Sequence, residues 1–93
     1  MMPLTMTDHA RVRRQQRAIP PEVLDYLLDY GHWAHEARGA DIVWFDQRAR
    51  AQLKRQLPAP QYRALEAKLK AYAVVDTDGA IVTVGYRHRR INH

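Results

Sequence analysis

Three side chains that could do chemistry share one face of the first predicted helix. His9, Arg13 and Arg17 are spaced four residues apart. Because a helix turns about 100° per residue, these side chains lie within about 80° of one another. The helix has almost no large apolar residue with which to dock, so packing alone does not explain this stripe. Two explanations are open: pairing with the carboxylates of residues 21–45, or binding of a ligand's phosphate groups.

His9 lies in the first turn of that helix, after the predicted N-cap Thr7. The positive end of the helix dipole disfavours a charged imidazole, and the two arginines act in the same direction. We therefore expect a neutral His9 that can accept a proton near neutral pH. Such a base can deprotonate the 2′-hydroxyl of RNA, while guanidinium groups stabilise the charge that develops on phosphorus. The stripe predicts metal-independent cleavage of RNA.

The last predicted strand provides a second set of candidates. Its side chains alternate between two faces, with Ile81, Thr83, Gly85 and Arg87 on one, and Val82, Val84, Tyr86 and His88 on the other. We expect Thr83 and Arg87 to bind phosphate, with Arg87 joining the catalytic set. Each of them is also compatible with an ordinary position on the surface of a sheet.

Aromatic and basic residues alternate at the end of this strand. Tyr86 and His88 could stack on a base or transfer a proton, and Arg89 and Arg90 extend the basic run. Such interleaving is typical of nucleic-acid contact. We expect RNA as the partner, more than DNA.

A metal centre is not predicted. His32, His35 and Glu36 suggest ligands, but positions three apart on a strand face opposite sides, and no second pair has matching spacing. The chain has no cysteine, which excludes disulfides and thiolate ligands. It also lacks a glycine-rich phosphate loop and a nucleophile elbow. We expect neither a metal ion nor a cofactor.

Eight elements must position these residues, in the order ααββααββ. The predicted helices cover residues 8–17, 21–30, 46–57 and 61–70, and the predicted strands 32–37, 41–45, 71–75 and 80–86. Prolines at 20, 21, 58 and 60 separate the helices, and Asp78-Gly79 marks a hairpin turn. The pattern predicts a single α+β domain over residues 1–93, with residues 1–6 as a flexible start.

Charge is distributed unevenly along the chain. The net charge is +5, from 15 basic and 10 acidic residues, and most of the cations are arginine. Residues 21–45 are acidic, whereas the segments on either side are basic, which favours a polyanionic partner. No apolar run approaches the roughly 18 residues of a membrane span, and no signal peptide is visible. We expect a cytoplasmic protein without membrane attachment.

The opening segment resembles a bacterial family known as domain of unknown function 4258. Residues 7–20, TDHARVRRQQRAIP, follow the family pattern T-x-H-A-x-x-R-x-x-x-R, with Ala18 in place of the usual glycine. Residues 81–87, IVTVGYR, resemble the family's closing strand. The resemblance implies a ribonuclease fold like that of RelE, barnase, EndoU and colicin-type toxins, with two N-terminal helices on a four-stranded antiparallel sheet.

The same resemblance carries His9, Arg13 and Arg17 over as functional residues of the helix, and Thr83 and Arg87 as those of the strand. It also implies a toxin-like activity and a cognate antitoxin or immunity protein as partner. The helices at 46–70 exceed what a minimal ribonuclease fold needs, and are interpreted as a partner-binding insert. Fold resemblance does not establish activity. A nucleic-acid-binding module without catalysis, or a protein-interaction domain, remains the alternative.

Overall fold

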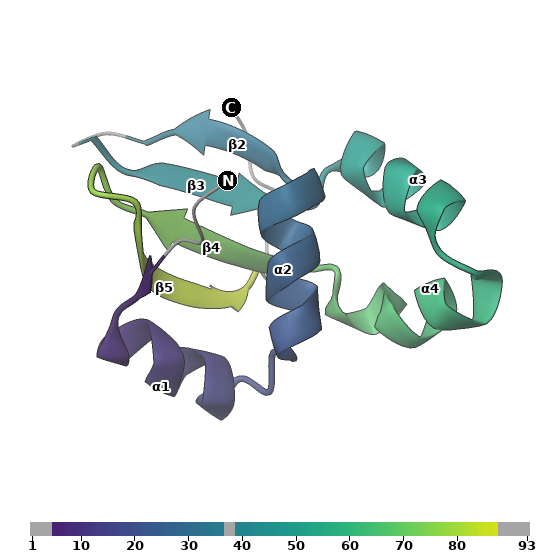
Figure 1. Ribbon diagram of the computed structural model, residues 1–93, viewed down its shortest axis with the longest axis horizontal. Helices are drawn as coiled ribbons and strands as arrows, with labels where there is room; N and C mark the ends of the chain where they lie inside the picture. The colour runs from purple at the N-terminus through teal and green to yellow at the C-terminus, as the bar shows by residue number, and fades with distance from the viewer. Residues whose placement is uncertain (1–4, 37–38, 88–93) are drawn as a thin grey trace.

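The computed structural model describes residues 5–36 and 39–87 as an α+β fold with one five-stranded mixed sheet. Its strands lie in the order β1-β5-β4-β3-β2 (Figure 1). The strands are β1 (Thr5–Met6), β2 (His32–His35), β3 (Asp41–Trp44), β4 (Ala71–Val75) and β5 (Ala80–Tyr86). The helices are α1 (Asp8–Gln16), α2 (Pro21–Tyr30), α3 (Gln47–Gln56) and α4 (Ala59–Leu65), followed by the short 3-10 helix η2 (Glu66–Lys68).

The sheet differs from the predicted one by its first strand. Thr5 and Met6 pair in parallel with Ala80 and Ile81, and the backbone N–H of Thr7 donates to the carbonyl of Ile81 at 3.0 Å. The predicted four-stranded antiparallel sheet and the order ααββααββ are therefore wrong in this respect. The prediction of a flexible start over residues 1–6 is also wrong for residues 5 and 6, which form β1. A two-residue strand has no periodicity of its own, since its partner lies at the other end of the chain.

Local signals set most helix ends. The side chain of Thr7 accepts a hydrogen bond from the backbone N–H of Ala10 at 3.2 Å, and that of Asp46 accepts one from Ala49 at 2.8 Å. The N-terminal cap of α1 is thus as predicted, and Asp46 caps α3 in the same way. α4 begins earlier than expected, because Pro60 is tolerated in a first turn that needs no N–H donor. None of the helices in residues 5–36 and 39–87 is long and apolar enough to cross a bilayer.

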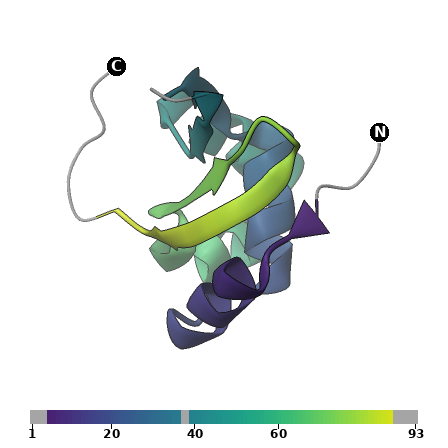
Figure 2. The same cartoon turned by 90° about the vertical axis from the view of Figure 1, so that its left-hand side faces the viewer.

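The core lies between α2 and one face of the sheet. α2 packs over β4 and β3, and α1 runs beside β5 (Figures 1 and 2). The largest fully buried side chains are Phe45, Ile19, Leu27, Leu53, Leu69, Ile81, Val23, Val43 and Val84. On the opposite face of the sheet, Ile42, Val74 and Thr83 form one cross-strand row and remain partly exposed.

A β-bulge in β5 changes which residues share a face. Val75 pairs with Ile81, whereas its neighbour Val74 pairs with Thr83, so Val82 is an extra residue in the ladder. As a result Ile81 and Val84 both face the core, with exposed fractions of 2% and 1%. The predicted grouping of Ile81 with Thr83 is therefore wrong. The bulge leaves Thr83 on the face away from the core.

Candidate nucleic-acid-binding site

α1 rests on β5 through its smallest side chain. Ala10 is the only buried residue of the helix, and its exposed fraction is 0%. On the helical wheel, His9 and Arg13 flank Ala10 on one side, while Arg14 and Arg11 flank it on the other. The small Ala10 allows close approach to the strand, so the long cationic side chains are placed on the two flanks of the helix.

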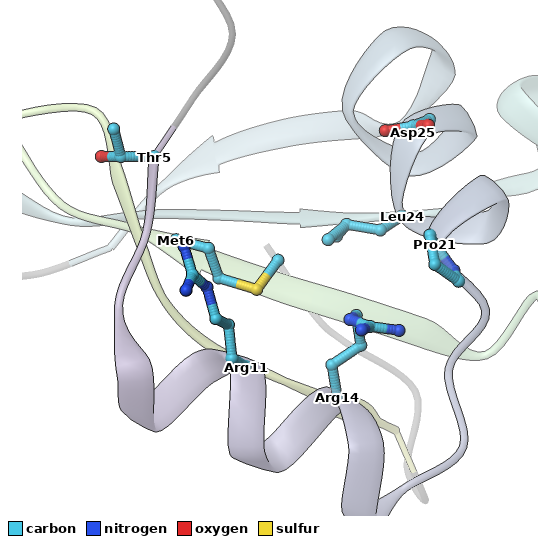
Figure 3. A pocket seen from close by; sticks show the side chains of 7 residues that line it. All are labelled: Thr5, Met6, Arg11, Arg14, Pro21, Leu24 and Asp25. Atoms are coloured by element: carbon cyan, nitrogen blue, oxygen red, sulfur yellow. The ribbon is translucent and has the colours of Figure 1, made fainter.

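The second flank of α1 borders a pocket of about 620 Å³ between β1, α1 and α2. Figure 3 shows Arg11 and Arg14 reaching into this pocket from α1, opposite Asp25 on α2. Arg14 donates through Nη1 to the carbonyl of Ile19 at 3.1 Å, and neither arginine forms an ion pair with Asp25. Since this flank faces α2, the flank that carries His9 and Arg13 is turned away from α2.

His9 and Arg13 contact each other directly. Nε of Arg13 donates to Nε2 of His9 at 3.5 Å, a long hydrogen bond between two solvent-accessible side chains. Arg17 follows as the C-cap of the helix and is exposed. The predicted stripe therefore exists as a set on one side of α1.

Carboxylates do not neutralise this stripe. Within residues 5–36 and 39–87 the ion pairs are His32–Asp46 at 3.4 Å and His35–Asp41 at 3.2 Å. Both histidines lie on β2, the edge strand farthest from β1 and separated from β5 by β3 and β4. Pairing of the α1 arginines with the acidic residues 21–45, the first explanation offered above, is therefore not what the structure shows.

The C-terminal end of α1 is tied to β5 and η2 at one atom. The carbonyl oxygen of Ala18 accepts from the hydroxyl of Tyr86 at 3.3 Å and from Nζ of Lys68 at 3.4 Å. Nζ of Lys68 also lies 5.8 Å from the centre of the Tyr86 ring. These contacts bring the end of the α1 stripe to the C-terminal end of β5.

A second pocket, of about 300 Å³, opens at this junction. It is lined by Ala67, Lys68, Lys70, Tyr86 and Arg87, so every ionic side chain that lines it is basic. The Tyr86 ring forms part of its wall, although the Tyr86 hydroxyl is already engaged with Ala18. The pocket therefore suits an anionic ligand that has a flat or apolar part.

Arg87 lies between this pocket and α3. Its backbone N–H donates to the carbonyl of Lys70 at 2.8 Å, and Nη2 reaches the carbonyl of Phe45 at 3.5 Å. Nε of Arg87 is buried and has no hydrogen-bond partner. Burial, and then the neighbouring Arg50 guanidinium, lower the pKa of Arg87 below its ordinary value. Arg87 is thus a cation that has no carboxylate partner among residues 5–36 and 39–87.

Arg50 approaches the same carbonyl from α3. Its Nε donates to the oxygen of Phe45 at 3.3 Å, and its Nη2 donates to the oxygen of Leu69 at 2.8 Å. Residue spacing does not predict Arg50, Lys68 or Lys70 as site residues. They lie in the segment interpreted as an insert, and only the fold brings them to β5.

The predicted residues thus fall into two groups. His9, Arg13 and Arg17 line α1, whereas Tyr86 and Arg87 lie at the end of β5. No hydrogen bond or ion pair among the described residues joins His9 to Arg87. Thr83 lies on the sheet face away from the core. The predicted contacts of His88, Arg89 and Arg90 lie outside the described residues.

No family model, curated protein or solved structure matches this chain. The resemblance of its opening motif to domain of unknown function 4258, and the ribonuclease fold that it implies, therefore stay predictions.

Proposed function

We propose that this protein binds single-stranded RNA along α1 and the C-terminal end of β5, and cleaves it without a metal ion. The observation that carries this proposal is the set of cations at these two places that have no carboxylate partner among the described residues: Arg13, Arg17, Lys68, Lys70 and Arg87. In a small domain, unpaired cations gathered on adjoining elements favour a polyanion.

The spacing of these cations suits a nucleic-acid backbone. From His9 to Arg17 the helix rises about 12 Å, at about 1.5 Å per residue. The stripe then continues through the carbonyl of Ala18 to Lys68 and Tyr86. A single small anion would occupy only part of this length. A chain of several phosphates can contact the stripe and the pocket together.

The cleavage step is assigned to His9. In the proposed step, Nε2 of His9 is released from Arg13 and takes the proton of a 2′-hydroxyl. The Arg13 guanidinium turns to the phosphate oxygens and stabilises the negative charge that develops there. The 2′-hydroxyl oxygen attacks phosphorus, the bond to the 5′-oxygen breaks, and that oxygen receives a proton from solvent water. DNA lacks this nucleophile, which is why RNA is the proposed substrate.

A second candidate function is RNA binding without cleavage. One observation favours it: Arg13 is the only described side chain within hydrogen-bonding distance of His9, and the Tyr86 hydroxyl is bonded to Ala18. The described residues therefore hold no ready general acid beside His9. In this alternative the same cations bind the backbone and His9 is dispensable.

One experiment separates these functions. Purified protein is incubated in EDTA with a 5′-labelled single-stranded RNA, and both binding and cleavage are measured. Cleavage by the wild type, its loss in His9→Ala with unchanged affinity, and full activity of the control His35→Ala are expected. Binding without cleavage would establish the second function instead. Absence of binding at low salt would overturn both.

A further inference from the structure

We propose that Arg50 and Arg87 form a site for a phosphate monoester, the group found at a phosphorylated end of an RNA strand. The anion site is inferred from the geometry of the two arginines. Its use for RNA ends rests on the function proposed above. A phosphate within an RNA strand is a diester with one negative charge, whereas a terminal phosphate carries nearly two at neutral pH.

The two guanidinium groups converge on one oxygen. Arg50 Nε lies 3.3 Å and Arg87 Nη2 lies 3.5 Å from the carbonyl oxygen of Phe45. One neutral acceptor therefore serves two positive charges. Asp46, four residues before Arg50, has a carboxylate that caps α3 and pairs with His32. Asp78, nine residues before Arg87, forms no ion pair with the described residues.

Donors remain free for a ligand. The Nη1 atoms of Arg50 and Arg87 make no hydrogen bond to the described residues. Among the side chains of the described residues, Arg87 Nε is the only buried nitrogen or oxygen atom that lacks a hydrogen-bond partner. Neither Nη1 atom is used by the contacts that hold the two side chains. Two such donors from separate planar groups can bind two oxygens of one phosphate.

The charge of the ligand determines whether this site prefers a phosphate monoester or a phosphate diester. Arg50 and the burial of Arg87 both disfavour the charged form of Arg87, which is why its pKa is lowered. A dianion compensates both guanidinium charges, whereas a diester compensates one. Lys68 and Lys70 line the adjoining pocket of about 300 Å³, which has room for the sugar and base that carry the terminal phosphate.

The backbone holds the pair in place without a ligand. Arg50 is fixed by the carbonyls of Phe45 and Leu69, and Arg87 by the ladder bond from its N–H to the carbonyl of Lys70. The two side chains therefore approach each other because the segments directly before α3, directly before β4 and directly after β5 meet at Phe45, Leu69 and Arg87. An anion bound here would not need to order them first.

The test compares short RNAs of one sequence that differ only at their ends: a 5′-phosphate, a 3′-phosphate, the methyl ester of each, and hydroxyls at both ends. Direct binding is measured by fluorescence anisotropy, and the Nε–Hε signals of the arginines are followed by NMR. One phosphorylated RNA should bind about tenfold more tightly than its methyl ester, because the ester has one charge less. Which end shows the preference identifies the natural source of the monoester.

Variants test whether these two arginines cause the preference for the phosphate monoester over its methyl ester. Arg50→Gln and Arg87→Gln should abolish it, whereas Arg55→Gln, an exposed arginine of the same helix, should retain it. If Arg50→Gln does not fold, the comparison of monoester and methyl ester on the wild type still decides. Equal affinity for the two would overturn the inference while leaving RNA binding intact. Binding of inorganic phosphate at Arg87 without RNA binding would retain the site and overturn the proposed function.

Discussion

At the residue scale, Ala18 holds a backbone conformation that alanine rarely adopts. Its φ angle is +52°, in the left-handed region where a side chain crowds the backbone. The position turns the chain between α1 and α2, and its carbonyl oxygen accepts the hydrogen bonds of Tyr86 and Lys68. The residue that strains the backbone therefore also joins the two parts of the candidate site.

Replacing Ala18 by glycine should stabilise the protein. We expect Ala18→Gly to raise the free energy of unfolding by about 0.5–1 kcal/mol, since relief of the left-handed strain exceeds the added freedom of the unfolded chain. Urea denaturation measures the change. Ala51→Gly, at an exposed position inside α3, is the matched control and should lower stability by about 1 kcal/mol. A loss of stability in both variants would contradict the assignment of strain to Ala18.

The candidate site could be predicted in part from residue spacing. Helical periodicity placed His9, Arg13 and Arg17 together, and strand alternation placed Tyr86 opposite Thr83. Nothing local marks Arg50, because an arginine on α3 looks like any solvated helix residue until the fold brings it to Phe45 and Leu69. Lys68 and Lys70 were missed for the same reason.

At the scale of elements, the junction between α2 and β2 is a close steric fit. A Cβ atom at Gly31 would meet the carbonyl oxygen of Leu27 and would lie 2.6 Å from Cγ2 of Val43. Both neighbours belong to packed elements, Leu27 to α2 and Val43 to the interior strand β3. Only glycine lets the chain leave the helix and enter the edge strand within one residue.

Gly31→Ala should therefore destabilise the fold by about 1–3 kcal/mol, the usual cost of overpacking. The midpoint of urea denaturation reports this loss. Gly85→Ala provides the comparison, since its Cβ would lie 3.0–3.2 Å from the Tyr72 ring, a side chain that can turn aside. An equal or larger loss for Gly85→Ala would show that the junction is not the tighter of the two.

Most elements follow from local signals, and the exceptions have long-range causes. Caps at Thr7 and Asp46, together with the prolines, mark the helices, and Asp78-Gly79 marks the last hairpin. β1 could not be predicted from the sequence, because Thr5 and Met6 form a strand only by pairing with β5. The bulge at Val82 could not be predicted either, because the alternation of residues along β5 looks regular until the strand is paired with β4.

At the scale of the whole molecule, the proposed function predicts a steep dependence of RNA affinity on salt. Five cations along α1, η2 and β5 imply about five phosphate contacts, and hence a slope near −3.5 for the logarithm of affinity against the logarithm of salt concentration. Anisotropy titrations between low and moderate salt measure this slope. Arg17→Gln should make it shallower by about 0.7, whereas Arg55→Gln should leave it unchanged. A slope shallower than about −1 would contradict an extended contact with the backbone.

The pairing of β1 with β5 also affects the order in which the protein is assembled. β5 supports α1 and pairs with Thr5 and Met6, yet the ribosome makes it after every other described element. Contacts between such distant segments form late, because a long loop must close first. A nascent chain therefore carries its cationic helix without the strand that positions it. Under the proposed function, the RNA-binding surface would be complete only once β5 has been synthesised.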